Sequence, residues 1–242
     1  MNDFQNLIRQ RRSTRDFKPD PIAPELLQLV LDDANQSPSW GNTRPFRVAI
    51  AQGAVRDRLA AALRARYAAG IRAQKEGPLG MLKLALQKGA LPDGDFKVNF
   101  KYPADLQAHR VATGKGLYGL LNIGRNDITA RDAQMGRNFE FFGAPVAMFV
   151  FVHAGLREFS VLDAGIWLQT LILSAQSHGL ATCAQGALAI WGGPLRAEFE
   201  VPVHYKLVCG VSIGFASTHA VNGFNPGRRD VQETFLLPKP GR

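Results

Sequence analysis

Residues 146–153 read VAMFVFVH, an eight-residue segment in which only the last side chain is polar. A strand with apolar side chains at successive positions has no face that suits water, so both of its faces must be buried. Gly143, Ala144 and Pro145 mark the turn that leads into it. The segment therefore predicts a central strand that is covered on both sides of its sheet.

Helical and extended patterns are interspersed along the rest of the chain. Apolar residues at helical spacing predict helices over residues 3–10, 24–36, 54–74, 130–142 and 162–177. Further strands are expected at 46–52 and 206–216, where Val, Ile and Phe are frequent. Because the connections are too irregular for repeated crossovers, this pattern favours an α+β sandwich over a doubly wound fold.

The chain has 242 residues and no internal repeat, so we expect a single domain over residues 1–242. Residues 76–128 look like a variable insertion in that domain. Their first part, residues 76–105, contains turn signals such as Gly77-Pro78 and lacks clear periodicity. Such a segment is often a lid, and we expect it to influence substrate selectivity.

Composition narrows the class of protein. Two cysteines are too few for a disulfide framework, and five scattered histidines show no metal-site spacing, so no metal is expected. The first 17 residues lack the apolar core of a signal peptide, which predicts a cytoplasmic protein. Residues 164–195 carry no charge, but glutamines and glycines interrupt them, so they predict a buried helix rather than a membrane span. The formal charge of +9 fits an anionic small ligand, a nucleic acid or a membrane surface, and does not choose among them.

The densest polar group is RRSTR, at residues 11–15. Three guanidiniums and two hydroxyls within five positions can converge on one phosphate, because arginine offers forked donors and serine adds a short one. That arrangement suits a phosphate monoester better than a duplex backbone. A solvated basic turn would use the same residues, so the run alone leaves both interpretations open.

A second polar group is the loop SPSWGNTRPF, at residues 37–46. Its two prolines restrict the backbone, while Ser39 and Asn42 supply groups that can hydrogen-bond the edge of a planar heterocycle. A plain turn from a helix to a strand has a similar composition. The loop alone therefore does not establish a binding site.

Residues 114–119 read GKGLYG and match the dinucleotide-binding pattern G-x-G-x-x-G. That pattern has meaning only between a buried strand and a helix. The preceding residues, ADLQAHRVAT, do not form a buried strand pattern, so we reject a dinucleotide site of this type. Cys183 and Cys209 are likewise interpreted as small core residues rather than nucleophiles.

Taken in order and spacing, four segments resemble the FMN-dependent nitroreductase family. They are RRSTRDF, SPSWGNTRPF, DAGIWLQTLILSAQSHGLATCAQG and the late pair Arg228-Arg229, and YGLLNIGR is similar to a segment of nitrobenzoate-reductase-like members. The resemblance covers essentially the whole chain, with residues 76–128 as an elaboration. It implies a mixed, largely antiparallel sheet between helix layers, in an intertwined homodimer with FMN at the subunit interface.

The resemblance also implies roles for individual residues. The implied FMN contacts are Arg11, Arg12 and Ser13 at the phosphate and ribityl chain, Arg15 near the pyrimidine end, Pro38, Ser39 and Asn42 in the loop that the partner subunit contributes, Asn138, Gln185 and Gly186 at the ring, and Arg228 at the phosphate. The chain departs from the family at Arg44 and Phe46, where glutamine and tryptophan are usual. Asn225 stands where close relatives carry an arginine, and Arg229 is expected to compensate for it.

The implied activity is that of an oxidoreductase, which passes a hydride from NADH or NADPH through flavin N5 to a flat electron acceptor such as a nitroaromatic or a quinone. Because one stacking surface serves donor and acceptor in turn, ping-pong kinetics are expected. No side chain is expected to act as a catalytic acid or base, and no nucleic acid or membrane partner is expected. Two alternatives stay open, a sibling flavin chemistry such as dehalogenation or dehydrogenation, and a basic polyanion-binding protein without catalysis.

Overall fold

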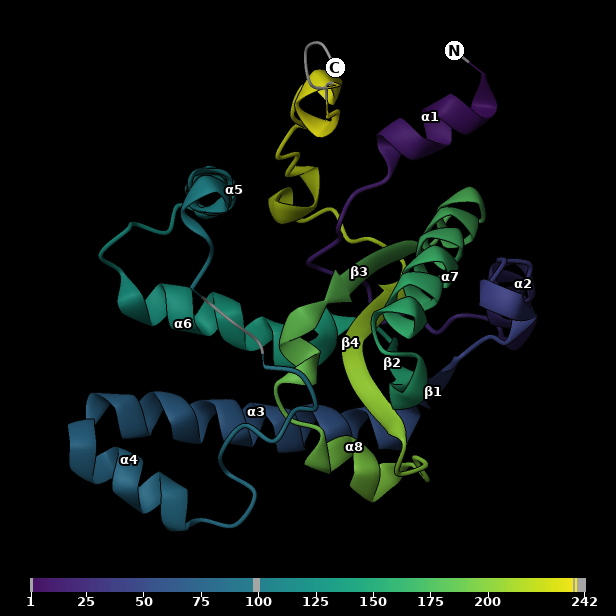
Figure 1. The fold of residues 1–242 in the computed structure, drawn as a ribbon. Helices are drawn as coiled ribbons and strands as arrows, with labels where there is room; N and C mark the ends of the chain where they lie inside the picture. The colour runs from purple at the N-terminus through teal and green to yellow at the C-terminus, as the bar shows by residue number, and fades with distance from the viewer. Residues whose placement is uncertain (1, 98–100, 237, 239–242) are drawn as a thin grey trace.

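A computed structural model shows a four-stranded antiparallel sheet between layers of helices (Figure 1). It describes residues 2–97, 101–236 and 238. The other positions of the predicted domain 1–242, including 98–100 of the predicted insertion, lie outside the described residues. The expected fold class, an α+β structure with a largely antiparallel sheet, is confirmed.

The described helices and strands follow one another from α1 to β4 along the chain. In order they are α1 (Asp3–Gln10), α2 (Pro24–Asn35), β1 (Phe46–Gln52), α3 (Gly53–Lys75), α4 (Gly77–Leu86), α5 (Ala104–Leu120), α6 (Ile128–Gly136), β2 (Val146–His153), α7 (Glu158–Ser177), β3 (Ala181–Gln185), α8 (Gly193–Glu198) and β4 (Tyr205–Gly214). Two short 3-10 helices matter for the site, η2 (Arg137–Gly143) and η4 (Gly186–Ala189).

The strands lie in the order β1-β2-β4-β3, and every pair within the sheet is antiparallel. A single parallel bridge joins Ser13 to Thr182 at the outer edge of β3. The segment that follows α1 thus lies against the sheet edge. This contact brings the N-terminal polar run to the sheet edge that β3 forms, near the start of that strand.

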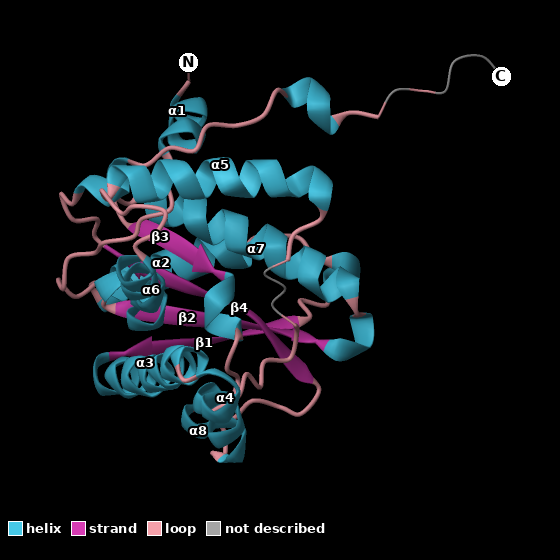
Figure 2. Cartoon of the chain, turned by 90° about the vertical axis from the view of Figure 1, so that its left-hand side faces the viewer, coloured by secondary structure: helices cyan, strands magenta, loops and turns pink. Residues whose placement is uncertain are grey.

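β2 lies inside the sheet and is buried on both faces, as its sequence predicts. Phe149 and Phe151 point to a core shared with α3, η2 and α8. Met148 and Val150 point to the opposite core, which α2 and α7 share. Figure 2 shows the resulting layers, with the strands between α3 and α8 on one side and α7 on the other.

The segment predicted to be irregular is helical in part. α4 begins directly after α3, and its proline stands in the first turn, where the missing N–H costs no helical hydrogen bond. Gly77-Pro78 therefore starts a helix instead of ending one in a loop. The expectation of an irregular 76–105 segment is wrong over residues 77–86, and α5 occupies much of the remaining insertion.

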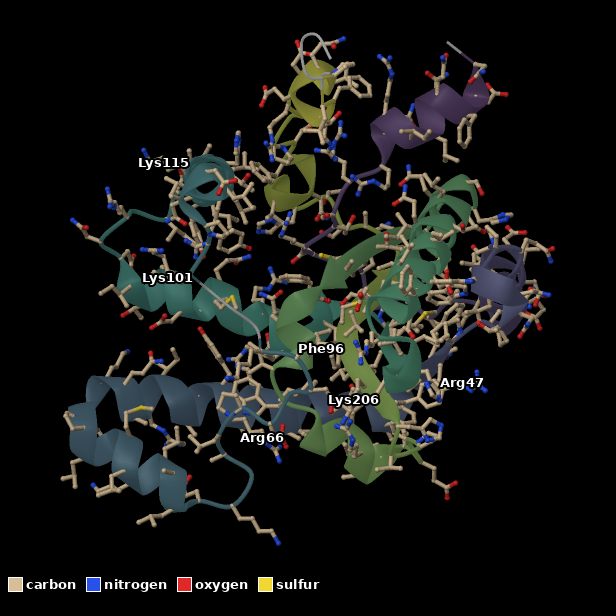
Figure 3. All side chains as sticks on the ribbon, in the orientation of Figure 1. Arg47, Arg66, Phe96, Lys101, Lys115 and Lys206 are labelled. Atoms are coloured by element: carbon tan, nitrogen blue, oxygen red, sulfur yellow. The ribbon has the colours of Figure 1, made fainter. Side chains whose placement is uncertain are left out.

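A short segment between α4 and α5, residues 90–95, crosses the end of η4, and we call it the strap. Asp93 accepts hydrogen bonds from the backbone amides of Gly192, at 2.8 Å, and Gly193, at 3.1 Å. Figure 3 labels Phe96, the residue that follows the strap. This part of the insertion is thus fastened to the core beside the loop that follows β3.

Three other element predictions need correction. The helix expected at 130–142 ends at Gly136, and the chain continues as η2 with positive φ at Phe141 and Phe142. Both rings are buried, and this burial offsets the strain of a conformation that bulky residues rarely adopt. The strand expected to reach residue 216 ends at Gly214, and β3 was not predicted at all.

α7 differs from its prediction in length and in how much of its surface is buried. It begins at Glu158, and in the single chain only one of its faces is buried. Leu162 and Ile166 on the other face are 59% and 37% exposed. Within the described residues, every helix is too short or too polar to span a lipid bilayer.

Candidate functional site

The arginine run takes its shape from the two elements beside it. α1 begins with a reciprocal cap between Asn2 and Gln5 and ends at Gln10, so the run starts where the helix stops. Beyond it the chain is extended, and the amide of Thr14 donates to the carbonyl of Thr182 in β3 at 3.0 Å. The run therefore lies along the edge of the sheet and is not a free basic turn.

A segment near the C-terminus meets this run from the other side. The side-chain oxygen of Asn222 accepts a hydrogen bond from the Arg15 amide at 2.9 Å, and its nitrogen donates to the Asp16 carbonyl at 2.7 Å. Asn222 thus joins two segments more than 200 residues apart in sequence. Sequence reasoning missed it, because nothing local distinguishes this asparagine from an ordinary turn residue.

The two segments enclose a small pocket of about 60 Å³. It is lined by Arg11, Arg12, Ser13, Arg15, Thr113, Phe224, Asn225, Pro226 and Arg228. Roughly 10–15 Å³ suffices for one water molecule, so the pocket has room for a small polyatomic anion. Five of the predicted FMN contacts thus come together in one place.

The pocket carries positive charge without balancing acid. Among the described residues, no carboxylate forms an ion pair with Arg11, Arg12 or Arg228. The nearest acid in sequence, Asp16, accepts hydrogen bonds from Arg137 and Ser217 instead. Although burial opposes it, these hydrogen bonds lower the pKa of Asp16, so the carboxylate is committed outside the pocket.

Like charges crowd the guanidinium of Arg11. Burial lowers its pKa, and the neighbouring cations Arg228 and Arg12 lower it further. A bound phosphate would relieve both effects, because it supplies opposite charge and forked acceptors. The chemistry of these donors therefore fits the phosphate of a mononucleotide such as FMN.

Arg15 lies at one side of the pocket and is held in place. Its guanidinium carbon stands 6.0 Å from the ring centre of Phe224, and one nitrogen donates to the Ser13 carbonyl at 3.2 Å. A fixed cation at this position can favour negative charge on a ligand that extends from the pocket. Sequence reasoning included Arg15 but not its aromatic support.

The helix α5 completes the pocket through Thr113, which the sequence analysis also missed. Gly116, one turn further on, lets α5 approach closely, since a Cβ there would stand 2.9 Å from the ring of Phe224. The glycines of the rejected G-x-G-x-x-G pattern thus lie inside a helix, whose Lys115 is labelled in Figure 3. Small residues at helical spacing were the signal that could have predicted this contact.

Two late residues differ in their positions. Arg228 lines the pocket, whereas Arg229 is exposed and is not among its lining residues. Asn225 lines the pocket as well, but its side-chain oxygen accepts from the Gly227 amide at 3.2 Å. The geometry thus provides no replacement by Arg229 for an arginine at position 225.

The residues predicted to meet the flavin ring lie at the other end of β3. Gln185 is buried, and its amide nitrogen donates to the carbonyl and side-chain oxygens of Asn138 at 3.1 and 3.2 Å. Its oxygen accepts from Ser212 at 2.5 Å. Gly186 is exposed, with no atom within 4 Å of where a Cβ would be. Since a strand advances about 3.3 Å per residue, this open backbone lies about 13 Å along the chain direction of β3 from Thr182.

The loop containing Pro38, Ser39 and Asn42 lies elsewhere in the single chain. The amide of Trp40 donates to the carboxylate of Asp163 in α7 at 3.1 Å, and the ring of Trp40 contacts Phe159. None of the loop residues lines the arginine pocket. Within one chain, therefore, the structure does not bring these three residues to the other predicted contacts.

The backbone of this loop is unusual. Gly41, Asn42 and Arg44 have φ values of 56°, 54° and 48° within four positions. Asparagine tolerates that conformation, but for arginine it costs on the order of 1–3 kcal/mol. Residues held in this way cluster at binding sites, which agrees with the predicted role of the loop.

Other chemistry finds little support among the described residues. No three His, Cys, Asp or Glu side chains there gather as a metal site would require. Burial raises the pKa of Cys183 to about 11, even though Arg15 and Arg11 oppose that shift. The thiol is therefore protonated near neutral pH and is not an activated nucleophile.

Comparisons with known proteins agree with this geometry. The model of the nitroreductase family matches residues 8–215. Nitroreductase NfnB of Mycolicibacterium smegmatis is 32% identical over 95% of this chain and 90% of its own length. The 4-nitrobenzoate reductase of Pseudomonas putida is 32% identical over 96% and 93%. The crystal structure of the FMN-dependent nitroreductase NfnB from Mycobacterium smegmatis in complex with NADPH superimposes with a TM-score of 0.81 at 31% identity, covering 97% of both chains.

Proposed function

The chain belongs to the nitroreductase family, and from that premise we propose how its residues hold the cofactor. The protein is an NAD(P)H-dependent FMN oxidoreductase. In the proposal, Arg11, Arg12 and Arg228 bind the FMN phosphate, and Ser13 contributes a hydroxyl. The observation that carries it is the cluster of guanidiniums around one small pocket without a partner carboxylate among the described residues.

When bound, FMN would supply hydride transfer from NAD(P)H to a flat acceptor such as a nitroaromatic or a quinone. Arg15, held by Asn222 and Phe224, faces the pyrimidine end in this proposal and favours negative charge there. The open backbone at Gly186 lets a planar ring approach the end of β3 without a side chain in the way. Gln185 helps to fix that backbone, because its amide nitrogen donates to the carbonyl and side-chain oxygens of Asn138. The pocket's basic residues surround one small space, whereas a polyanion would need an extended basic surface. This arrangement does not favour the alternative of a polyanion-binding protein.

The test is the visible absorbance of freshly purified protein, followed by denaturation and identification of the chromophore released. We expect FMN at about one molecule per chain, because each chain provides one arginine pocket. A colourless protein that takes up no added FMN would contradict the assignment and leave only the likeness of fold.

A homodimer is part of the proposal. The outer face of α7 and the loop beside it expose apolar side chains, among them Trp40, Phe159 and Leu162. A second copy of the chain would cover this patch and bring its Pro38, Ser39 and Asn42 to the first copy's cofactor. The loop has a strained backbone and does not line the pocket of its own chain, and both observations support this arrangement. The proposal also includes a nitroaromatic or quinone as the acceptor. It further includes a cytoplasmic location, since the two free cysteines fit a reducing compartment.

Leu162→Glu tests the dimer, because it puts a charge at the centre of the exposed apolar patch. We expect light scattering to give twice the chain mass for the parent protein and a shift toward single chains for the variant. Loss of dimer and weaker FMN binding should appear together. Leu29→Glu, the same exchange at an exposed leucine of α2, is the matched control. A parent protein that is monomeric with FMN still bound would refute the shared site.

A further inference from the structure

Another cavity lies beside η2 and the end of η4, and it shares no lining residue with the arginine pocket. It has a volume of about 220 Å³ and opens between the α3–α4 hairpin and the strap. Its lining comes from Tyr67, Gly70, Ile71, Gln74, Leu84 and Phe139, with Met81, Ala90, Leu91, Pro92, Met135, Ile190 and Trp191 around them. None of the proposed FMN contacts is among these residues.

Three aromatic rings form one wall of this cavity. Tyr67 lies 4.9 Å from Phe139 between ring centres, and Trp191 meets Phe139 edge-on at 5.3 Å. Phe139 and Trp191 are buried. Rings in such a cluster present both faces and edges, which are the surfaces that a further aromatic ring prefers to contact.

The polar atoms of the rings are already satisfied. The Tyr67 hydroxyl donates to the carbonyl of Asp132 at 3.0 Å, and the Trp191 indole nitrogen donates to that of Ala90 at 3.2 Å. Burial raises the pKa of Tyr67 to about 12, so its phenol stays neutral. Among the residues that the structure describes, no charged side chain lines the cavity. An ionised ligand would therefore lose its hydration without gaining a partner.

The strap is fastened to the chain beside it by backbone contacts. The Gly94 amide donates to the Ile190 carbonyl at 3.0 Å, and a Cβ on Gly94 would stand only 2.0 Å from the Ala189 carbonyl oxygen. The strap therefore lies in direct backbone contact with η4. Met81 and Leu91, each 41% exposed, stand at the mouth. The cavity thus has a hydrogen-bonded wall on the strap side and an apolar entrance.

We propose that this cavity is a second binding site, separate from the flavin, for an uncharged monocyclic aromatic molecule. An apolar cavity of about 150 Å³ is large enough to bind benzene, and this one is larger. The occupant packs against Phe139. None of the proposed FMN contacts lines this cavity, so the site is distinct from the one proposed for the cofactor.

Gly70 offers a clean way to fill the cavity. It lies within α3 and lines the cavity, and no atom lies within 4 Å of where its Cβ would be. Gly70→Leu adds a side chain into open space and replaces a poor helix former with a good one, so the variant is expected to fold. Gly70→Ala fills less of the space. Gly119→Leu in α5 is the matched control, since that glycine is helical and equally uncrowded but distant from the cavity lining.

The probe is fluorobenzene, whose fluorine NMR line broadens on binding and which a flavin cannot reduce under the assay conditions. With the FMN-loaded protein we expect saturable broadening, at least tenfold weaker binding to Gly70→Leu, an intermediate effect for Gly70→Ala and none for Gly119→Leu. We expect 4-fluorobenzoate to bind this cavity at least tenfold more weakly, because of its charge. The flavin absorbance should not change.

Three results would overturn the proposal. The first is that fluorobenzene does not bind the parent protein, for example because a side chain of a second copy fills the cavity. The second is equal binding to the parent protein and to Gly70→Leu. The third is a change in flavin absorbance that follows fluorobenzene binding. Because FMN content is read independently from the absorbance, failure of this proposal is distinguishable from failure of the proposed function.

Discussion

The arginine pocket and the strap both gather charged side chains, but they balance that charge in opposite ways. Asp95 in the strap accepts from Arg196 at 2.6 Å and from the Leu207 amide at 2.7 Å. Lys206 adds a further ion pair to it at 3.6 Å. Arg11 in the pocket meets other cations, and among the described residues no carboxylate pairs with it.

This difference separates structural charge from charge kept for a ligand. A carboxylate whose partners are all in place contributes to the folded state itself. A group of like charges without partners costs stability until something of opposite sign binds. The two regions should therefore respond to mutation in opposite ways, one in ligand affinity and the other in stability.

The largest expected effect is that of Arg11→Ala on FMN. Removing a charge-assisted contact with the phosphate should weaken FMN binding by about 100-fold. Because Arg11 has only like-charged neighbours in the pocket, the FMN-free protein should be no less stable than the parent. Titration of apoprotein with FMN, together with urea unfolding of the same apoprotein, checks both parts.

Arg9→Ala is the control for this measurement, because Arg9 is an exposed arginine at the end of α1 and does not line the pocket. Its FMN affinity should match that of the parent. If Arg11→Ala bound FMN as tightly as the parent protein, the arginine pocket would not be a ligand site, and its contrast with the strap would not hold.

The next largest effect is that of Asp95→Ala on stability. The change leaves Arg196 and the Leu207 amide without their acceptor, and we expect a loss of about 2 kcal/mol in the free energy of unfolding. FMN affinity should change little, since the strap does not line the arginine pocket. Urea unfolding beside FMN titration measures both, with the exposed Asp20→Ala as control.

The ion pair between Asp95 and Arg196 also predicts that stability depends on pH. Although burial opposes it, hydrogen bonds from Arg196 and the Leu207 amide lower the pKa of Asp95 below its ordinary value. A carboxylate whose pKa is lower in the folded protein than in the unfolded chain stabilises the protein at pH values above the unfolded-state pKa, about 3.9. This contribution is lost as the pH falls through the folded-state pKa. The stability gap between the parent and Asp95→Ala should be full at pH 6 and should shrink below about pH 4. A gap that stays constant down to pH 3 would refute the linkage.

The smallest effect is expected for Arg229→Ala. Arg229 is exposed and does not line the pocket, so only a screened, long-range attraction to FMN is lost. We expect FMN affinity to fall less than threefold at physiological ionic strength, as measured by the same titration. A tenfold fall would assign Arg229 to the phosphate site, as the sequence resemblance implies.

Parts of the fold followed directly from local sequence. The apolar run of β2 required burial on both faces, and the structure provides it with Phe149 on one side and Met148 on the other. α1 was predicted at its observed bounds, Asp3–Gln10, because its apolar spacing and its end before the arginine run are both local signals. These elements owe their form to side chains within a few residues of each other.

Other elements were mistaken because their local signals were ambiguous. Gly77-Pro78 suggested a turn, yet proline in the first turn of a helix is equally favourable, and α4 begins there. β3 is five residues of small and polar character, and its extended form depends on pairing with β4 and with Ser13. Neither pattern by itself contained the contact that decided the outcome.

The sequence by itself determined the chemistry of the site, because Arg11, Arg12, Ser13 and Arg15 are adjacent in the chain and their donors suit one phosphate. Only the tertiary structure decided what joins them. Thr113 and Asn222 come from segments about 100 and 210 residues away, and they meet the run through α5 and the C-terminal segment. The resemblance implies Arg228 at the phosphate, but only the packing places it in the same pocket as the run. Local sequence encodes which atoms a residue offers, whereas the packing of distant segments determines which of those atoms stay unpaired for a ligand.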